Sequence, residues 1–289
     1  MLPADGFSFA REARSGTKSQ SLEKWFSTGT GGKEGMAVRH LKAGSLKIEI
    51  HPDRETAGNA AAQATAAALL ELGREPGNIG VIVATGASQM ETLRALTTIP
   101  DVPWERVLGF HMDEYIGIAP DHPASFRRYM RERLTGRVRM QKFLEVDGNA
   151  EDAEKACRDY AAELRAANPR LCLLGIGENG HLAFNDPGVA DFHDPVDMKI
   201  VHLDHACRQQ QTAEGWFGSV EEVPERAMTL TIPALFRVPR LIASVPGSRK
   251  AAIVARTLAE PISVDCPATI LRTHPDATLY LDAESAAKI

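Results

Sequence analysis

The sequence predicts an α/β fold: a single domain of three layers in which an open, doubly wound and mostly parallel sheet lies between helices, as in Rossmann-like proteins. Two observations carry this prediction. Apolar runs of strand length alternate with segments of helical period from residue 46 onward, which is typical of βαβ units. The chain has 289 residues, 44% of them hydrophobic and 25% charged, so it can bury a core large enough for such a sheet.

The chain changes character near residue 45. The first 44 residues are rich in Ser, Thr, Gly and Lys and show no strand signal, so we expect an N-terminal arm over 1–44. All the expected strands and helices fall in 45–289, and no internal repeat divides this part. We therefore expect one α/β domain over 45–289.

Eight apolar runs have the length and composition of strands. The run LCLLGIG is nearly all apolar, as a central parallel strand buried on both faces should be. The expected strands are 46–51, 81–85, 106–112, 171–177, 198–204, 227–232, 240–246 and 277–282.

Segments of helical period lie between these strands. The Ala-rich segment 54–73 has high helix propensity and closes on Gly73, and 151–166 is acidic first and basic last, which complements its own dipole. The expected helices are 54–73, 87–96, 122–134, 151–166 and 248–258.

Charge and composition exclude several classes of partner. The 33 basic and 38 acidic residues give a formal charge of −5, so no overall positive field attracts nucleic acid, and an anionic ligand needs a local site. The apolar runs are too short to cross a membrane, and the N-terminus lacks the apolar core of a signal peptide. Four scattered cysteines read as buried reduced thiols, so we expect a cytoplasmic protein.

Ligands of doubly wound sheets bind beyond the carboxyl ends of the strands, where this chain has unusual residues. In ATGAS (84–88), Gly86 and Ala87 allow backbone amides to face a phosphate, although a simple turn would have the same composition. In HMDEY, Asp113 and Glu114 should point to opposite faces, so that one reaches the cleft while the other anchors a loop.

Two further strand ends complete the expected site. In LLGIGENGHLAFNDPG (173–188), His181 is the only imidazole in a Gly-rich loop, and Asp186 is near enough in sequence to reach its ring. In PGSRKAA, Arg249 and Lys250 either meet a ligand phosphate or form a solvated helix face. The pair His202 and His205 lacks a supporting carboxylate, so we expect no metal site there.

Together these segments resemble the glucosamine-6-phosphate deaminase/isomerase family, which shares its fold with 6-phosphogluconolactonase. The matching blocks span 46–289 in order, and MDEY and GIGENGHLAFN are the most specific of them. The resemblance implies a small-molecule substrate: an amino-sugar phosphate, glucosamine 6-phosphate, converted to fructose 6-phosphate and ammonia without a metal or organic cofactor. It leaves open the sugar configuration and whether the chain forms a homo-oligomer.

The resemblance also implies roles for individual residues. Asp113 is the base that moves a proton between carbons 2 and 1, His181 assists ring opening, and Asp186 orients His181. The phosphate-binding positions that it implies are Thr85, Gly86, Ala87, Ser88, Lys250 and Arg208.

Two positions depart from the family pattern. Many members have an aspartate where this chain has Asn179, and a glutamate where it has Asp186. Asn179 cannot hold a negative charge beside an imidazolium, so we expect His181 to be less biased toward its charged form and the pH optimum to be shifted.

Two other functions stay open. A 6-phosphogluconolactonase normally continues its loop toward SLFP and carries a DER-type segment, whereas this chain has AFNDP and MDEY. A sugar-phosphate sensor that regulates transcription needs a helix-turn-helix, and residues 1–44 are too poor in periodic apolar residues to form one.

Overall fold

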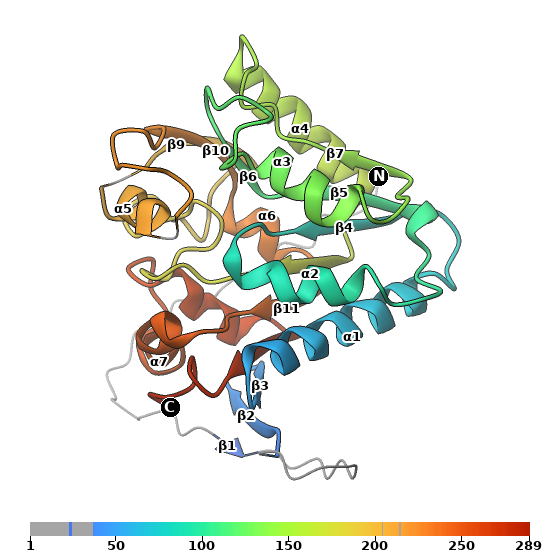
Figure 1. The fold of residues 1–289 in the computed structure, drawn as a ribbon, viewed down its shortest axis with the longest axis vertical. Helices are drawn as coiled ribbons and strands as arrows, with labels where there is room; N and C mark the ends of the chain where they lie inside the picture. The colour runs from blue at the N-terminus through green and yellow to red at the C-terminus, as the bar shows by residue number, and fades with distance from the viewer. Residues whose placement is uncertain (1–22, 25–36, 204, 214) are drawn as a thin grey trace, which may run out of the picture.

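The computed structural model describes residues 23–24, 37–203, 205–213 and 215–289 (Figure 1). Its main sheet has the strand order β1-β2-β3-β12-β11-β8-β4-β5-β7. All neighbours from β3 to β7 are parallel, whereas β1, β2 and β3 pair antiparallel. The strands are β1 (Glu23–Lys24), β2 (Arg39–Ala43), β3 (Leu46–His51), β4 (Ile79–Val83), β5 (Val107–His111), β7 (Lys142–Leu144), β8 (Leu171–Leu174), β11 (Arg240–Ser244) and β12 (Ala277–Asp282).

Helices cover both faces of this sheet, so the predicted three-layer, doubly wound fold is confirmed (Figure 1). Side chains of successive strand residues point to opposite faces. In β4, Ile82 packs in the cluster that contains α4, α6 and α7, whereas Val81 and Val83 pack with α1, α2 and α3. The helices are α1 (Arg54–Leu72), α2 (Met90–Leu96), α3 (Phe126–Met130), α4 (Ala153–Ala167), α5 (His205–Ala213), α6 (Ile232–Phe236) and α7 (Ala251–Ala259). Within the described ranges, none of them is long and apolar enough to cross a bilayer.

Two of the eight predicted strands lie outside the main sheet. The runs 198–204 and 227–232 contain β9 (Met198–His202) and β10 (Arg226–Leu230). They form a separate antiparallel sheet in which β10 lies between β9 and β6 (Asp113–Tyr115). Placing them in the main sheet was wrong, because an apolar run predicts a strand but does not choose its partner. Here β10 pairs with its two neighbours along their whole length, and this small sheet carries Asp113.

The main sheet also begins earlier than predicted. Residues 39–43 form β2, which pairs with β3 across a turn at Gly44, and β1 pairs with β2 in turn. The absence of strands over 1–44 was therefore wrong for these two segments. The buried positions of β2 are Leu41 and Ala43 alone, which is too short an alternation to stand out in the sequence. The rest of the predicted arm, 1–22 and 25–36, lies outside the described residues.

The completely buried carboxylate of Glu114 fixes the start of α3 beside β6. It accepts hydrogen bonds from the Ser125 hydroxyl at 2.8 Å, from the Phe126 backbone at 3.1 Å, and from the Arg127 backbone and Nε at 3.0 and 3.2 Å. Arg127 is itself buried. The expectation that one residue of the Asp113–Glu114 pair anchors a loop is confirmed for Glu114.

Removing the charge of Glu114 should destabilise the fold. We expect Glu114→Gln to lower the free energy of unfolding by about 3 kcal/mol, because it removes the buried counter-ion of Arg127 and leaves this buried guanidinium paired only with the exposed carboxylate of Asp147. Urea denaturation measures this loss. Glu145→Gln, which breaks the solvent-exposed pair with Arg131, is the matched control and should leave the midpoint unchanged. Equal midpoints for both variants would show that the buried pair stabilises nothing.

Candidate active site

A cavity of about 440 Å³ opens where the loops after β11, β8, β4 and β5 meet. These four strands are neighbours in the sheet and parallel, so their carboxyl ends share one edge. Each loop supplies lining residues of a different kind. They are Thr85 to Ser88 after β4, Asp113 after β5, His181 after β8, and Arg249 and Lys250 after β11.

The loop 85–88 after β4 has the geometry of an anion-binding turn. Gly86 has φ of 102°, a left-handed value that favours glycine, and the chain then enters a 3₁₀ turn and α2. Two side chains hold the loop by its carbonyl oxygens: the Tyr129 hydroxyl donates to Gly86 at 2.8 Å, and Arg54 donates to Ala87. The turn is therefore fixed before any ligand binds.

The buried amide of Gln89 joins this loop to its neighbours. Its Nε2 lies 3.0 Å from the Ser88 hydroxyl, 3.2 Å from the Leu174 carbonyl and 3.3 Å from the Ser244 carbonyl. Leu174 ends β8 and Ser244 ends β11. One side chain thus sets the spacing of three strand ends.

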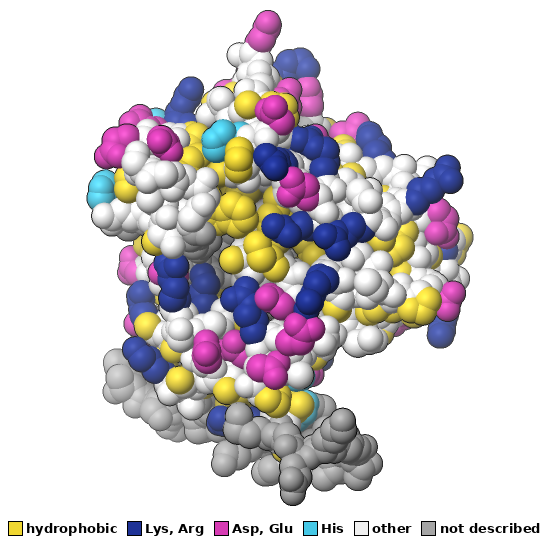
Figure 2. All heavy atoms as spheres, in the orientation of Figure 1, with side chains coloured by type: hydrophobic (Ala, Val, Ile, Leu, Met, Phe, Trp, Pro, Cys, Tyr) yellow, Lys and Arg dark blue, Asp and Glu magenta, His cyan; other side chains and the backbone are white. Residues whose placement is uncertain are grey.

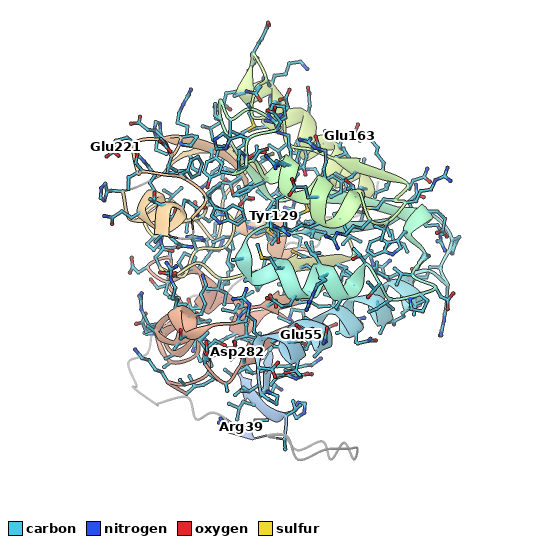
Figure 3. All side chains as sticks on the ribbon, in the orientation of Figure 1. Arg39, Glu55, Tyr129, Glu163, Glu221 and Asp282 are labelled. Carbon is cyan, nitrogen blue, oxygen red and sulfur yellow. The ribbon has the colours of Figure 1, made fainter. Side chains whose placement is uncertain are left out.

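The loop after β11 repeats the form of the loop after β4. Gly247 has φ of 97° and leads into a 3₁₀ turn over Ser248–Lys250 and then α7. The backbone N–H of Gly247 donates to Asp282 at the end of β12, labelled in Figure 3, at 3.0 Å. Arg249 makes an ion pair of 2.7 Å with Glu178, which lies in the loop after β8. Both cations of this loop line the cavity.

Asp113 places a carboxyl group in the wall of the cavity. The residue is 6% exposed, and burial, assisted by the neighbouring charge of Glu114, raises its pKa well above the ordinary aspartate value. A carboxyl group with a raised pKa is a stronger base once ionised than an exposed aspartate. Asp113 is therefore suited to take a proton from a weak acid.

His181 is held from behind by two side chains. Its Nδ1 lies 2.8 Å from Asp186 Oδ1, and the same oxygen accepts from Asn179 Nδ2 at 2.7 Å. Burial raises the pKa of Asp186, but hydrogen bonds from His181, Asn179 and Cys207 outweigh burial, so the net pKa is lowered. The carboxylate is thus an ionised acceptor, which fixes the proton on Nδ1 and leaves Nε2 as the free nitrogen.

The backbone of the loop after β8 shapes itself around this ring. A Cβ on Gly177 would lie 2.2 Å from His181 Nε2, so only glycine lets the imidazole pack there. The Asn179 Oδ1 accepts from the His181 backbone N–H at 3.0 Å. The side-chain amide of Asn179 thus contacts the carboxylate of Asp186 and the backbone of His181.

The structure brings most of the predicted site residues together. Asp113, His181, Lys250 and the loop 85–88 line one cavity, with Asn179 and Asp186 behind the histidine. Arg208 is different: its guanidinium donates to the Val220 carbonyl at 2.9 Å, pairs with Glu225 at 3.5 Å, and does not line the cavity among the described residues. The structure thus gives no support to Arg208 as a phosphate ligand.

Sequence reasoning missed Arg54, Gln89 and Glu178. Arg54 is the first residue of α1, directly beyond the carboxyl end of β3, so the strand-end rule could have found it. Glu178 follows the carboxyl end of β8, so the same rule could have found it. Gln89 gave no such signal, because its role depends on hydrogen bonds to loops that are distant in sequence.

The ligand atoms of His181, Asp186 and Cys207 lie within 4.8 Å of one another, which is the spacing of a metal site. In the present arrangement, however, Asp186 Oδ1 already accepts from His181 Nδ1 and Asn179. These hydrogen bonds occupy Asp186 Oδ1, and the absence of a metal stays a prediction.

Comparison with known proteins relates this site to a family. The family model described as Glucosamine-6-phosphate isomerases/6-phosphogluconolactonase matches residues 52–280. The glucosamine-6-phosphate deaminase of Listeria innocua is 32% identical over 219 residues, covering 76% of this chain and 92% of that one. The enzyme of the same name from Streptococcus thermophilus is 32% identical over 207 residues, covering 72% and 86% of the two chains.

Solved structures agree with this result. A monomeric glucosamine-6-phosphate deaminase superimposes with a TM-score of 0.77 at 29% identity, over 84% of this chain and 99% of that one. The 6-phosphogluconolactonase of Thermotoga maritima has the same fold, with a TM-score of 0.67 at 21% identity over 82% and 99% of the two chains. The chain belongs to the family of glucosamine-6-phosphate isomerases and 6-phosphogluconolactonases.

Proposed function

We propose that this protein is a glucosamine-6-phosphate deaminase, which converts glucosamine 6-phosphate and water into fructose 6-phosphate and ammonia. The observation that carries the proposal is that Asp113 and His181 line the same cavity as the loop 85–88. An acid–base pair and an anion-binding turn in one cavity suit an aldose–ketose isomerisation on a phosphorylated sugar. The relatives named glucosamine-6-phosphate deaminase at 32% identity support the same activity.

His181 opens the pyranose ring. Opening moves the proton of the anomeric hydroxyl to the ring oxygen. Near neutral pH one imidazole can accept the hydroxyl proton and donate a proton to the ring oxygen. Because Asp186 holds one proton on Nδ1, Nε2 is the nitrogen that exchanges a proton with the sugar. Asn179 keeps the carboxylate in place through its own bond to Oδ1.

Asp113 then moves a proton between neighbouring carbons. It removes the proton from carbon 2 of the open aldehyde and returns it to carbon 1, while a second proton passes from the amino nitrogen to the oxygen on carbon 1. Carbon 1 is thereby reduced to a hydroxymethyl carbon, and carbon 2 is oxidised to an imine. Water adds to the imine and ammonia leaves, which gives the ketose. The oxidation and the reduction occur within one molecule, so the balance needs no external oxidant. Burial of Asp113 strengthens it as the base for this step.

The substrate phosphate binds at the loop 85–88, with Lys250 as its cationic partner. Gly86 allows the turn, the Ser88 hydroxyl is available beside it, and Arg249 and Lys250 come from the mirrored loop after β11. Fixing the remote phosphate orients the reacting carbons toward Asp113 and His181. We also propose that the enzyme acts in the cytoplasm, which the four buried free cysteines support.

Ammonia release tests the activity directly. On mixing with glucosamine 6-phosphate, the protein should release ammonia and fructose 6-phosphate in equal amounts, as measured by coupled enzymatic assays. The lactone of 6-phosphogluconate should hydrolyse no faster than in buffer. Binding of the amino sugar without turnover would instead indicate a sensor, and lactone hydrolysis without ammonia release would indicate a lactonase.

Replacing Asp113 should separate activity from stability. We expect Asp113→Asn to lower kcat by about 10²–10⁴-fold, the usual contribution of a general base. The folded protein holds the Asp113 proton more tightly than the unfolded chain, so this carboxyl favours folding at low pH and loses that contribution as pH rises. The variant should therefore gain stability relative to the wild type as the pH rises above about 4, the ordinary pKa of an aspartate in the unfolded chain.

Thermal unfolding across this pH range measures the second effect. The matched control is Asp121→Asn, an exposed aspartate outside the cavity lining, which should change neither kcat nor the pH dependence of unfolding. An Asp113→Asn variant that loses stability along with activity would show that Asp113 is a structural residue.

Asn179 and Asp186 should tolerate replacement by the residues of the family pattern only when both are replaced together. In Asn179→Asp, two carboxylates meet at the position of a 2.7 Å hydrogen bond, so they repel and one tends to take a proton, which weakens the grip on His181. We expect kcat/KM to fall on the order of tenfold, the equivalent of about one pKa unit.

The compensating variant is Asn179→Asp combined with Asp186→Glu, which reproduces the family pattern. The longer glutamate lets the two carboxylates separate, so steady-state kinetics should show recovery of most of the lost kcat/KM. If the double variant were slower than Asn179→Asp alone, the two positions would not act as a unit.

A further inference from the structure

Arg54 lies between the two glycine turns that border the active-site cavity. It is the first residue of α1 and lines the cavity. Its Nε donates to Glu91 Oε1 at 2.7 Å, and its Nη2 donates to the carbonyl of Ala87 in the loop 85–88. Its Nη1 lies 3.7 Å from the point that a Cβ on Gly247 would occupy. The guanidinium group therefore spans the space between the loop after β4 and the loop after β11.

These contacts leave one nitrogen of Arg54 free and fix its direction. A guanidinium group is planar, so holding Nε and Nη2 on one edge orients Nη1 on the other. Nη1 has no acceptor within the described part of the chain, and it is not one of the buried polar atoms without a partner. The side chain as a whole is 39% exposed. Nη1 is therefore an oriented donor that a ligand can reach.

The other arginines near the cavity are engaged elsewhere. Figure 2 shows Lys and Arg side chains gathered between α2 and α7, with Asp and Glu side chains among them, so charge alone does not single out one cation. Arg249 makes its ion pair with Glu178 and donates to the Ala213 carbonyl at 3.4 Å. Arg208 points to Glu225, away from the cavity. The counter-ion of Arg54, in contrast, lies outside the cavity lining.

The two glycine turns offer different numbers of free amides. The first two N–H groups of the turn after β11 donate to carboxylates, at 3.0 Å to Asp282 and at 3.2 Å to Glu284. The corresponding N–H groups after β4, those of Gly86 and Ala87, have no acceptor among the described residues. Carboxylates repel an anion, so the turn after β4 is the better side for a phosphate group. Arg54 is held against this turn.

We propose that Arg54 is a specificity-determining ligand of the substrate phosphate, which it binds through Nη1 while Nε and Nη2 keep the guanidinium beside the loop 85–88. It fills from the start of α1 the role that the family resemblance implied for Arg208 on α5. Arg54 and Lys250 then flank the phosphate, and two cations suit a dianion better than one. The proposal rests on the proposed function for the identity of the ligand.

Isothermal titration with glucitol 6-phosphate tests the contact. This probe carries the phosphate but has no carbonyl or amino group, so it binds without turnover. Arg54→Gln should weaken its binding by about 10–100-fold, as expected for the loss of a charged hydrogen bond. The matched control is Arg94→Gln, which breaks the exposed pair with Glu55 outside the cavity lining and should leave the affinity unchanged.

Glu91→Gln separates direct contact from positioning of the loop. The glutamine can still accept from Arg54 Nε, but the negative charge that competes for the guanidinium is gone. If Arg54 binds the phosphate, this variant should bind glucitol 6-phosphate as tightly as the wild type or more tightly. A loss of affinity as large as in Arg54→Gln would show that Arg54 acts only by holding the loop 85–88, and would overturn the proposal.

Circular dichroism verifies that each variant is folded. Arg54→Lys keeps the charge but loses the planar fork, so it should also weaken binding, and it replaces Arg54→Gln if that variant does not fold. Wild-type affinity in a folded Arg54 variant would overturn the proposal, as would a wild-type chain that does not bind the probe. A chain that releases no ammonia from glucosamine 6-phosphate but binds the probe through Arg54 would refute the proposed function and retain the phosphate ligand.

Discussion

The site depends on the register of three parallel strand ends, and one buried amide holds that register. Gln89 donates to the carbonyl at the end of β8 and to the carbonyl at the end of β11, while its own backbone belongs to the turn after β4. Strand pairing alone fixes the strands but leaves the loops beyond them free. Because the loop 85–88, His181 and Lys250 each follow one of these ends, their relative positions follow from this bridge.

The neighbouring carboxyl groups of Asp113 and Glu114 differ in their properties because their surroundings differ. Glu114 is surrounded by donors from the start of α3 and by Arg127, and these fix its charge in a structural role. Asp113 faces the cavity, where burial and the adjacent charge raise its pKa. The alternation of a short strand is enough to produce this division, since it sends adjacent side chains to opposite faces. The structural anchor and the base that we propose for proton transfer are thus adjacent residues.

The sequence was sufficient for the layers, most of the main-sheet strands and the residues at the strand ends, because hydrophobic period and turn composition are local properties. The sequence did not predict the features that depend on which strands pair. The partners of β9 and β10, and the strand β2, depend on contacts with distant segments that no local pattern encodes. The same reason explains the site: His181 and Asp186 lie in one loop and could be paired from spacing, whereas the direction of Arg208 depends on the packing of α5.

The binding of a sugar phosphate that we propose for this chain, whose formal charge is −5, depends on groups that are fixed during folding. Main-chain amides carry only partial charges, so they attract an anion well only if several point at it without further ordering. Here the cost of ordering the loop 85–88 is met by Gln89, Tyr129 and Arg54, whose contacts exist before any ligand arrives. The loop therefore needs few lysines and arginines, and long-range repulsion between the protein and its substrate is offset by short, directed contacts at one edge of the sheet.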